Sequence, residues 1–138
     1  MRLVVDANVI ISALIADSKS RELIVTLETE LLTPEFVATE IENYEALIVE
    51  KSGLRPERVS QFIELLFRHL EVVAASEFYP RIEAADAAIG ETDPDDVLYL
   101  ACALETDAEI WSDDTDFKQQ DLVPTHTTRE VVEQFATR

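Results

Sequence analysis

The chain has 138 residues, of which 47% are hydrophobic and 29% charged; this balance indicates one globular domain over residues 1–138 and excludes a disordered chain. Its uncharged apolar stretches fall far short of the ~18 residues of a membrane span, and one cysteine excludes a disulfide framework, so we expect a cytoplasmic protein. The 29 acidic residues against 11 lysines and arginines give a net charge of −18, which is typical of halophilic adaptation and excludes a surface that attracts polyanions over most of its area.

The first half of the chain alternates between apolar, strand-like runs and runs with helical spacing. An apolar strand over residues 3–5 ends at Asp6-Ala7-Asn8, where a tight turn leads into a helix. Beyond it we predict a helix over 18–27, a strand over 31–33, a helix over 34–51 that begins with Pro34 and is ended by Gly53, and a helix over 56–70.

The second half continues the alternation of strands and helices. We predict a strand over 72–74, a short helix over 80–88, a buried helix that Asp93 caps and Pro94 begins, strands over 109–112 and 122–126, and a last helix that starts with a capping box of Thr127 and Glu130. This order predicts an α/β fold, a three-layer α/β/α sandwich around a mainly parallel sheet of four to five strands.

Acidic residues recur at the predicted carboxyl ends of strands, where folds of this class bind ligands. Asp6 ends the first strand. The doublet Asp95-Asp96 lies in the first turn of a helix, which starts at the same edge of the sheet. The doublet Asp113-Asp114 follows a later strand. Each acid alone is equally explained as a helix cap or a loop residue, but convergence from three distant segments predicts a site.

Glu40 falls on the apolar stripe of its predicted helix. At about 100° per residue it lies between Leu47 and Tyr44, which we expect to face the core. A carboxylate on a buried stripe must be paired or bind a metal. An ion pair with Arg2 or Arg21 and a metal site are both open at this stage.

Several carboxylates in one pocket cannot all stay ionised unless a cation neutralises them. Ligand sets made only of oxygen suit Mg²⁺ or Mn²⁺, whose coordination is often completed by substrate phosphates. The implied chemistry is metal-assisted hydrolysis of phosphodiesters, with one carboxylate orienting or deprotonating the attacking water.

Three ordered segments resemble motifs of one nuclease family. Residues 1–14, which contain Asp6-Ala7-Asn8, resemble the opening of PIN-domain nucleases. Residues 96–104, an Asp at the head of an Ala/Leu-rich helix, are similar to the family's third motif, and residues 110–117 to its fourth. Glu40 matches the family's mid-chain Glu in position and helical setting.

The resemblance implies a set of functional residues. Its catalytic and metal-binding members are Asp6, Glu40, Asp96 and Asp114, with Asn8, Ser112 and Asp116 as orienting or accessory residues. The acidic doublets leave the register open by one residue. Asp96 is preferred because it shares a helix face with Leu100 and Ala103, whereas Asp95 is expected to cap the helix.

The resemblance also implies an activity and partners. Small prokaryotic members of the family include VapC-like toxins of type II toxin-antitoxin systems, which are Mg²⁺-dependent endoribonucleases that form homodimers and are silenced by a cognate antitoxin. Other members process RNA without a toxin role. The expectation is therefore a Mg²⁺- or Mn²⁺-dependent ribonuclease with an RNA substrate, a homodimeric state, and an antitoxin partner if it is a toxin.

RNA binding needs cations, and Lys51, Arg55 and Arg58 cluster between two predicted helices. They are also explained as solvated charges. No platform of exposed aromatic residues is evident, so nothing predicts sequence-specific reading of single-stranded RNA. The helix over 56–70 carries an apolar stripe that serves either the core or an interface with a second copy or an antitoxin: Phe62, Ile63, Leu66 and Phe67.

Two other functions compete with the nuclease. The first is phosphoryl transfer with Asp6 as the nucleophile, although Asn8 breaks the Asp-x-Asp pattern of such phosphatases and Lys118 is poorly placed as a receiver lysine. The second is a non-catalytic protein that retains the fold and uses its acidic edge to bind a partner.

Overall fold

The computed structural model describes residues 1–89 and 94–135. The described residues form a five-stranded parallel sheet in the order β3-β2-β1-β4-β5, as predicted for an α/β fold. Because β1 is central and every pairing is parallel, the carboxyl ends of the strands share one edge. The strands are β1 (Arg2–Val5), β2 (Glu30–Pro34), β3 (Leu70–Val73), β4 (Glu109–Trp111) and β5 (Thr125–His126).

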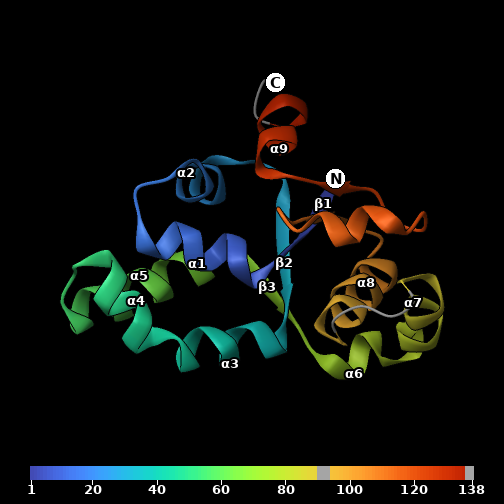
Figure 1. Ribbon diagram of the computed structural model, residues 1–138, viewed down its shortest axis with the longest axis horizontal. Coiled ribbons are helices and arrows are strands. Elements are labelled where there is room, and N and C mark those ends of the chain that lie inside the picture. Colours follow the sequence, from blue (N-terminus) through green and yellow to red (C-terminus); the bar gives the residue numbers. More distant parts are fainter. Residues whose placement is uncertain (90–93, 136–138) are drawn as a thin grey trace.

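Helices cover both faces of the sheet and make three layers (Figure 1). One side carries α1 (Ala7–Ile15), α3 (Glu35–Asn43), α4 (Glu45–Ser52) and α5 (Pro56–Phe67), and the other α6 (Ala75–Phe78), α7 (Ile82–Ile89) and α8 (Pro94–Thr106). The remaining elements are α2 (Lys19–Thr26), α9 (Thr128–Gln134) and the 3₁₀ helices η1 (Tyr79–Arg81) and η2 (Thr115–Gln119).

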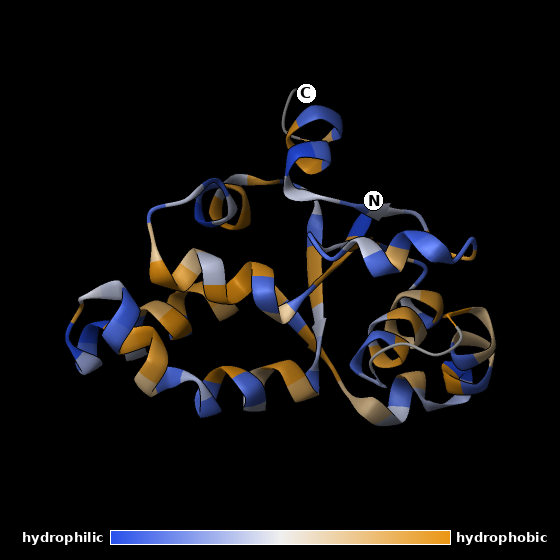
Figure 2. Cartoon of the chain, viewed as in Figure 1, coloured by the Kyte–Doolittle hydropathy of each residue, from blue (hydrophilic) through white to orange (hydrophobic). Residues whose placement is uncertain are grey.

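The core forms where β1 lies between these layers. Leu3, Val4 and Val5 are completely buried, since both faces of a central parallel strand are covered. Figure 2 shows hydrophobic residues along α1 and the central strands. The predicted burial of the apolar helix α8 is confirmed, because residues 99–103 are all buried. None of the described helices is long and apolar enough to cross a membrane.

The helix predicted over 34–51 is wrong as a single element. It is two helices, α3 and α4, that meet at Tyr44, whose backbone (φ −95°, ψ 6°) leaves the helical region. Pro34 ends β2 and precedes α3 rather than beginning the helix. Tyr44 and Leu47, predicted to face the core, are 44% and 39% exposed, whereas Ile48 keeps the buried face of Val37 and Ile41.

Other boundaries also differ from the sequence prediction. The helix over 56–70 ends at Phe67 because Leu70 enters β3, and the predicted helix over 80–88 becomes η1 and α7 after an unpredicted α6. The strand predicted over 122–126 has only two residues. The side-chain oxygen of Gln120 accepts hydrogen bonds from the backbone N–H groups of Leu122 and Val123, at 2.8 and 2.9 Å, so these groups do not pair with a strand.

Two predicted helix ends are confirmed. Gly53 follows α4 with a left-handed backbone, φ 72°. Thr127 and Glu130 form the predicted reciprocal capping box at the start of α9. The predicted cap Asp93 lies outside the described residues.

Candidate metal centre

Asp6 stands at the junction of β1 and α1. Its backbone N–H donates to the carbonyl of Trp111 in β4 at 3.0 Å, which extends the pairing of the two strands by one residue. Its carboxylate caps α1, because Oδ1 accepts the backbone N–H of Asn8 at 3.1 Å. The side chain is almost fully buried, so its position is set by the strand, the cap and its neighbours.

Ser112 connects Asp6 to the segment that follows β4. Its Oγ donates to Asp6 Oδ2 at 2.7 Å and accepts the backbone N–H of Asp114 at 3.0 Å. Asp114 in turn accepts the backbone N–H of Asp116 at 2.9 Å through Oδ1. The buried hydroxyl of Ser112 therefore fixes the position of Asp6 relative to Asp114.

The first turn of α8 brings further carboxylates to the same edge. Asp96 is buried, and Asp95 is more exposed. One carboxylate oxygen each of Asp96, Asp114 and Asp116 lies within 4.8 Å of the others, a spacing that a single ion can span. The helix N-terminus favours negative charge at this point.

The predicted site residues converge on one cavity of about 400 Å³. The four carboxylates expected to bind metal all line it, together with Asn8 and Asp95. Asp116 and Ser112 are not part of this wall, but they form hydrogen bonds with Asp114 and Asp6, respectively. The acidic residues of its wall are Asp6, Glu40, Asp95, Asp96 and Asp114.

Contacts to α9 distinguish the two residues of the second acidic doublet. Asp113 accepts the backbone N–H of Thr128 at 2.7 Å and its hydroxyl at 2.8 Å, so it holds the start of that helix. Asp114 is left to line the cavity. At the first doublet both Asp95 and Asp96 line the cavity, and burial alone distinguishes them.

Glu40 is half-buried at the cavity wall, on α3. The arginines considered as its partners have other contacts. Arg2 lies at the opposite end of β1 from the cavity and forms an ion pair with Glu30 at 3.0 Å. Arg21 donates to the carbonyl of Ala13 at 2.8 Å.

Tyr99 is a cavity residue that sequence reasoning missed. Its Oη accepts the backbone N–H of Ala7 at 3.0 Å, which satisfies the start of α1. Burial, together with the negative charge of Asp6, raises the pKa of Tyr99 and keeps its hydroxyl protonated. The available signal was its position three residues after Asp96 as a polar side chain in an apolar helix.

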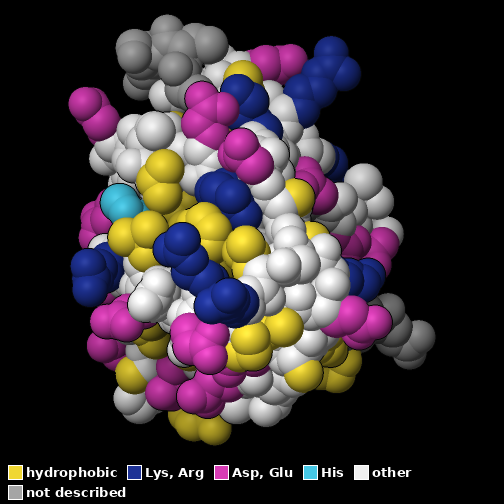
Figure 3. Space-filling view, turned by 90° about the vertical axis from the view of Figure 1, so that its left-hand side faces the viewer, with side chains coloured by type: hydrophobic (Ala, Val, Ile, Leu, Met, Phe, Trp, Pro, Cys, Tyr) yellow, Lys and Arg dark blue, Asp and Glu magenta, His cyan; other side chains and the backbone are white. Residues whose placement is uncertain are grey.

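The three cations predicted to bind RNA lie in succession along the junction of α4 and α5. Lys51 lines the acidic cavity itself, while Arg55 and Arg58 line a neighbouring hollow. Figure 3 shows Lys and Arg side chains gathered around an apolar patch on this side of the molecule, with carboxylates at its border. The three cations thus extend from the acidic cavity to the neighbouring hollow.

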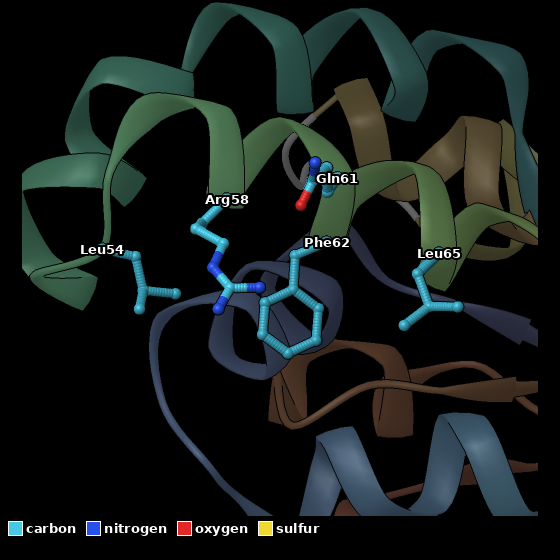
Figure 4. Close-up of a pocket in the computed structure, with 5 residues that line it drawn as sticks. All are labelled: Leu54, Arg58, Gln61, Phe62 and Leu65. Atoms are coloured by element: carbon cyan, nitrogen blue, oxygen red, sulfur yellow. The ribbon is translucent and has the colours of Figure 1, made fainter.

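A second, more apolar hollow lies along the outer face of α5. Its wall is drawn in Figure 4, where the side chains of Leu54, Arg58 and Phe62 point the same way. The guanidinium of Arg21 lies 4.4 Å from the centre of the Phe62 ring. Of the apolar stripe predicted on this helix, Leu66 is completely buried, and the others pack partly against the core.

Comparison with known proteins decides the family. A model of the PIN domain matches residues 4–136. The chain belongs to the PIN domain family. PIN domains are generally nucleases and typically use divalent metals, which accords with the acidic cluster of this one. No curated protein matches the chain in sequence.

Solved structures share the fold over nearly the whole PIN domain. A toxin-antitoxin complex from Klebsiella pneumoniae is 13% identical, with a TM-score of 0.68 over 91% of this chain and 97% of that one. VapBC2 from Rickettsia felis, bound to a DNA fragment from its promoter, is 14% identical, with a TM-score of 0.68 over 92% and 98%. FitAcB from Neisseria gonorrhoeae is 21% identical, with a TM-score of 0.65 over 94% and 99%.

Proposed function

We propose that this PIN domain is a Mg²⁺- or Mn²⁺-dependent endoribonuclease and the toxin of a type II toxin-antitoxin system. The observation that carries the proposal is the convergence of carboxylates from β1, α3, α8 and the loop after β4 on one cavity. Family membership supports nuclease chemistry, and the structural neighbours support the toxin role.

The donor set fits a hard divalent cation. The cavity wall offers carboxylate oxygens and, among the described residues, no histidine or cysteine, a set that favours Mg²⁺ or Mn²⁺ over zinc or copper. We assign the ion to Asp6, Glu40, Asp96 and Asp114, with Asp116 as an accessory residue. A bound ion would supply Lewis-acid stabilisation of charge on phosphate oxygens and activation of water.

The protein's own residues would then position the reaction. Ser112 and the backbone of Asn8 hold Asp6 in one orientation, and the N–H of Asp116 does the same for Asp114. A cavity carboxylate would accept the proton of the attacking water as the new phosphorus–oxygen bond forms. The leaving ribose oxygen would take a proton from solvent water as its bond to phosphorus breaks. This arrangement requires no covalent intermediate.

The aspartyl-phosphate alternative has less support. Lys118, the lysine considered for it, forms an ion pair with Glu130 at 2.8 Å and donates to the carbonyl of Thr125 at 3.1 Å. Those contacts hold its ammonium against α9 and β5. Both carboxylate oxygens of Asp6 are engaged, since Oδ1 caps α1 and Oδ2 accepts the hydroxyl of Ser112.

RNA would approach along the cations next to the cavity. Six of the ten described lysines and arginines form ion pairs with carboxylates, and the other four lie on α2, α4 and the start of α5: Arg21, Lys51, Arg55 and Arg58. In a chain with a net charge of −18, cations left without carboxylate partners are the groups available to phosphates.

The nuclease is tested by cleavage of end-labelled RNA in Mg²⁺ and Mn²⁺. We expect Asp6→Asn and Asp96→Asn to lower the cleavage rate at least a hundredfold, and Asp86→Asn, an exposed acid on α7, to leave it unchanged. Cleavage in excess EDTA, or full activity of both site variants, would refute the proposal.

The toxin role requires a separate test in cells. We expect growth arrest when the wild-type chain is expressed and relief when the reading frame immediately upstream is co-expressed. Light scattering of the purified protein tests the proposed homodimer. Growth that continues despite proven nuclease activity would assign the protein to RNA processing instead.

A further inference from the structure

The acidic cavity is also lined by apolar side chains. They come from α1 and from the junction of α3 and α4: Ile11, Ile15, Tyr44 and Leu47. Tyr44 is 44% exposed and Leu47 39% exposed, so both are among the large apolar side chains that folding leaves in contact with solvent. We call these four residues the apolar shelf.

The exposed ring of the shelf comes from Tyr44, where α3 and α4 meet. The break at Tyr44 keeps the hydrogen bonds on either side, Tyr44 N–H to the carbonyl of Glu40 at 3.0 Å and Ile48 N–H to that of Tyr44 at 2.9 Å. The backbone therefore stays hydrogen-bonded while an aromatic ring is directed to the cavity.

Lys51 ends the shelf. It lies one helical turn beyond Leu47 on α4 and lines the same cavity. Among the described residues it forms no ion pair, although a cavity rich in carboxylates lies beside it. Carboxylates, an exposed aromatic ring and a lysine thus line one cavity.

This combination of an aromatic ring and a lysine in one cavity matches the chemistry of one nucleotide. A phosphate needs cations, and a base needs an apolar or aromatic surface against its flat face. On the basis of the ribonuclease function proposed above, we infer that the shelf is a nucleobase subsite: the base next to the scissile phosphate stacks on Tyr44 and contacts Leu47, and Lys51 binds a neighbouring phosphate.

Two properties of the substrate follow from this subsite. A base can lie on the shelf only when it is unpaired and unstacked, so the substrate is single-stranded RNA or a loop rather than a duplex. Stacking accepts every base, and the shelf adds no buried hydrogen-bonding group, so the subsite selects strandedness rather than base identity.

The binding experiment uses a fluorescently labelled 12-nucleotide single-stranded RNA in Ca²⁺, followed by polarisation. We expect Tyr44→Ala to weaken binding about tenfold and Tyr44→Phe to restore it, because stacking needs the ring and not the hydroxyl. Tyr79→Ala is the matched control, since Tyr79 is an exposed tyrosine outside the cavity. Leu65→Ser is a similar control for Leu47→Ser, because the two leucines are 42% and 39% exposed.

An abasic scan of the RNA tests the stacked base directly. In the wild-type protein, removing one base is expected to weaken binding about tenfold at a single position beside the cleavage site. In Tyr44→Ala the same abasic RNA should bind as the intact RNA does. Equal effects of the abasic position in both proteins would overturn the subsite.

The cleavage assay separates this inference from the proposed function. If the wild type cleaves RNA and Tyr44→Ala raises KM with little change in kcat, both stand. If the wild type cleaves and Tyr44→Ala has an unchanged KM, the subsite is wrong and the nuclease stands. If the wild type does not cleave RNA but binds it in a way that depends on Tyr44, the nuclease function is wrong and the subsite stands. A changed molecular mass of Tyr44→Ala with unchanged RNA binding would identify the shelf as a self-association surface and overturn the inference.

Discussion

Ser112 Oγ donates a 2.7 Å hydrogen bond to Asp6 Oδ2, between residues that are 106 positions apart in the chain. Both side chains are buried, and the same hydroxyl accepts the N–H of Asp114. The ends of the neighbouring strands β1 and β4 are therefore joined by a side chain as well as by the sheet. The orientation of the buried carboxylate of Asp6 therefore depends on a hydroxyl from the segment that follows β4.

Removing this hydroxyl should destabilise the domain. In Ser112→Ala, Asp6 loses a donor in a buried setting, and we expect the free energy of unfolding to fall by about 1–3 kcal/mol. Urea denaturation measures the change, with Ser60→Ala on the exposed face of α5 as the control. Equal stability of the two variants would show that the hydrogen bond contributes nothing to the fold.

Divalent cations should stabilise the folded protein independently of any activity. An ion that binds the folded cavity and not the unfolded chain adds about 1.4 kcal/mol at ten times its Kd. We expect Mg²⁺ to raise Tm more than NaCl of the same ionic strength does. Asp96→Asn should abolish this difference and the exposed Asp86→Asn should retain it. A rise in Tm that persists in Asp96→Asn would assign the ion to other carboxylates.

The pair of Lys118 and Glu130 predicts a pH dependence of stability. The hydrogen bond from Lys118, and then that from the backbone of Thr127, lower the pKa of Glu130 from 4.5 to about 2. A lowered carboxyl pKa stabilises the fold above the unfolded-state value, and this contribution is lost as pH falls toward the folded-state value. Glutamine keeps the capping box but not the charge.

We therefore expect Glu130→Gln to be less stable than the wild type by about 0.5–1 kcal/mol at pH 7, a modest value because the pair is partly exposed. The difference should shrink between pH 4.5 and pH 2. Unfolding free energies of both proteins over this range provide the measurement. A difference that stays constant or grows in acid would contradict the assignment.

Gly53 should be sensitive to substitution for a conformational reason alone. Its φ is 72°, and a Cβ added there would meet no atom within 4 Å. We expect Gly53→Ala to lower the free energy of unfolding by about 1 kcal/mol and Gly53→Asn by less, because asparagine tolerates the left-handed region better. Thermal denaturation of the two variants tests this order. Alanine matching glycine would show that the backbone relaxes.

Local signals predicted most of the fold. The apolar run of β1, the turn at Asp6, the capping box of Thr127 and the stop at Gly53 are each determined within a few residues, and the structure has all of them. The parallel order of the sheet follows from the alternation of strands and helices. Features that depend on contacts between distant segments could not be predicted, because no local sequence pattern contains those contacts.

Three features that the sequence analysis left open or misplaced illustrate that limit. Periodicity predicted one helix through Tyr44, whereas the backbone of Tyr44 leaves the helical region between α3 and α4. The strand near residue 122 was shortened by the side chain of Gln120. The roles of Asp113 and Asp114 were separated only by Thr128, which is adjacent in space and distant in sequence. In the site, residue types were predictable and their exact partners were not.

The walls of the cavity are contributed in succession along the chain, with Asp6 first and Asp114 last. A ribosome that has not yet released β4 and the loop after it holds a nascent chain in which Asp6 lacks its serine partner and the cavity is open on one side. The cavity is therefore completed only after the loop that follows β4 has left the ribosome.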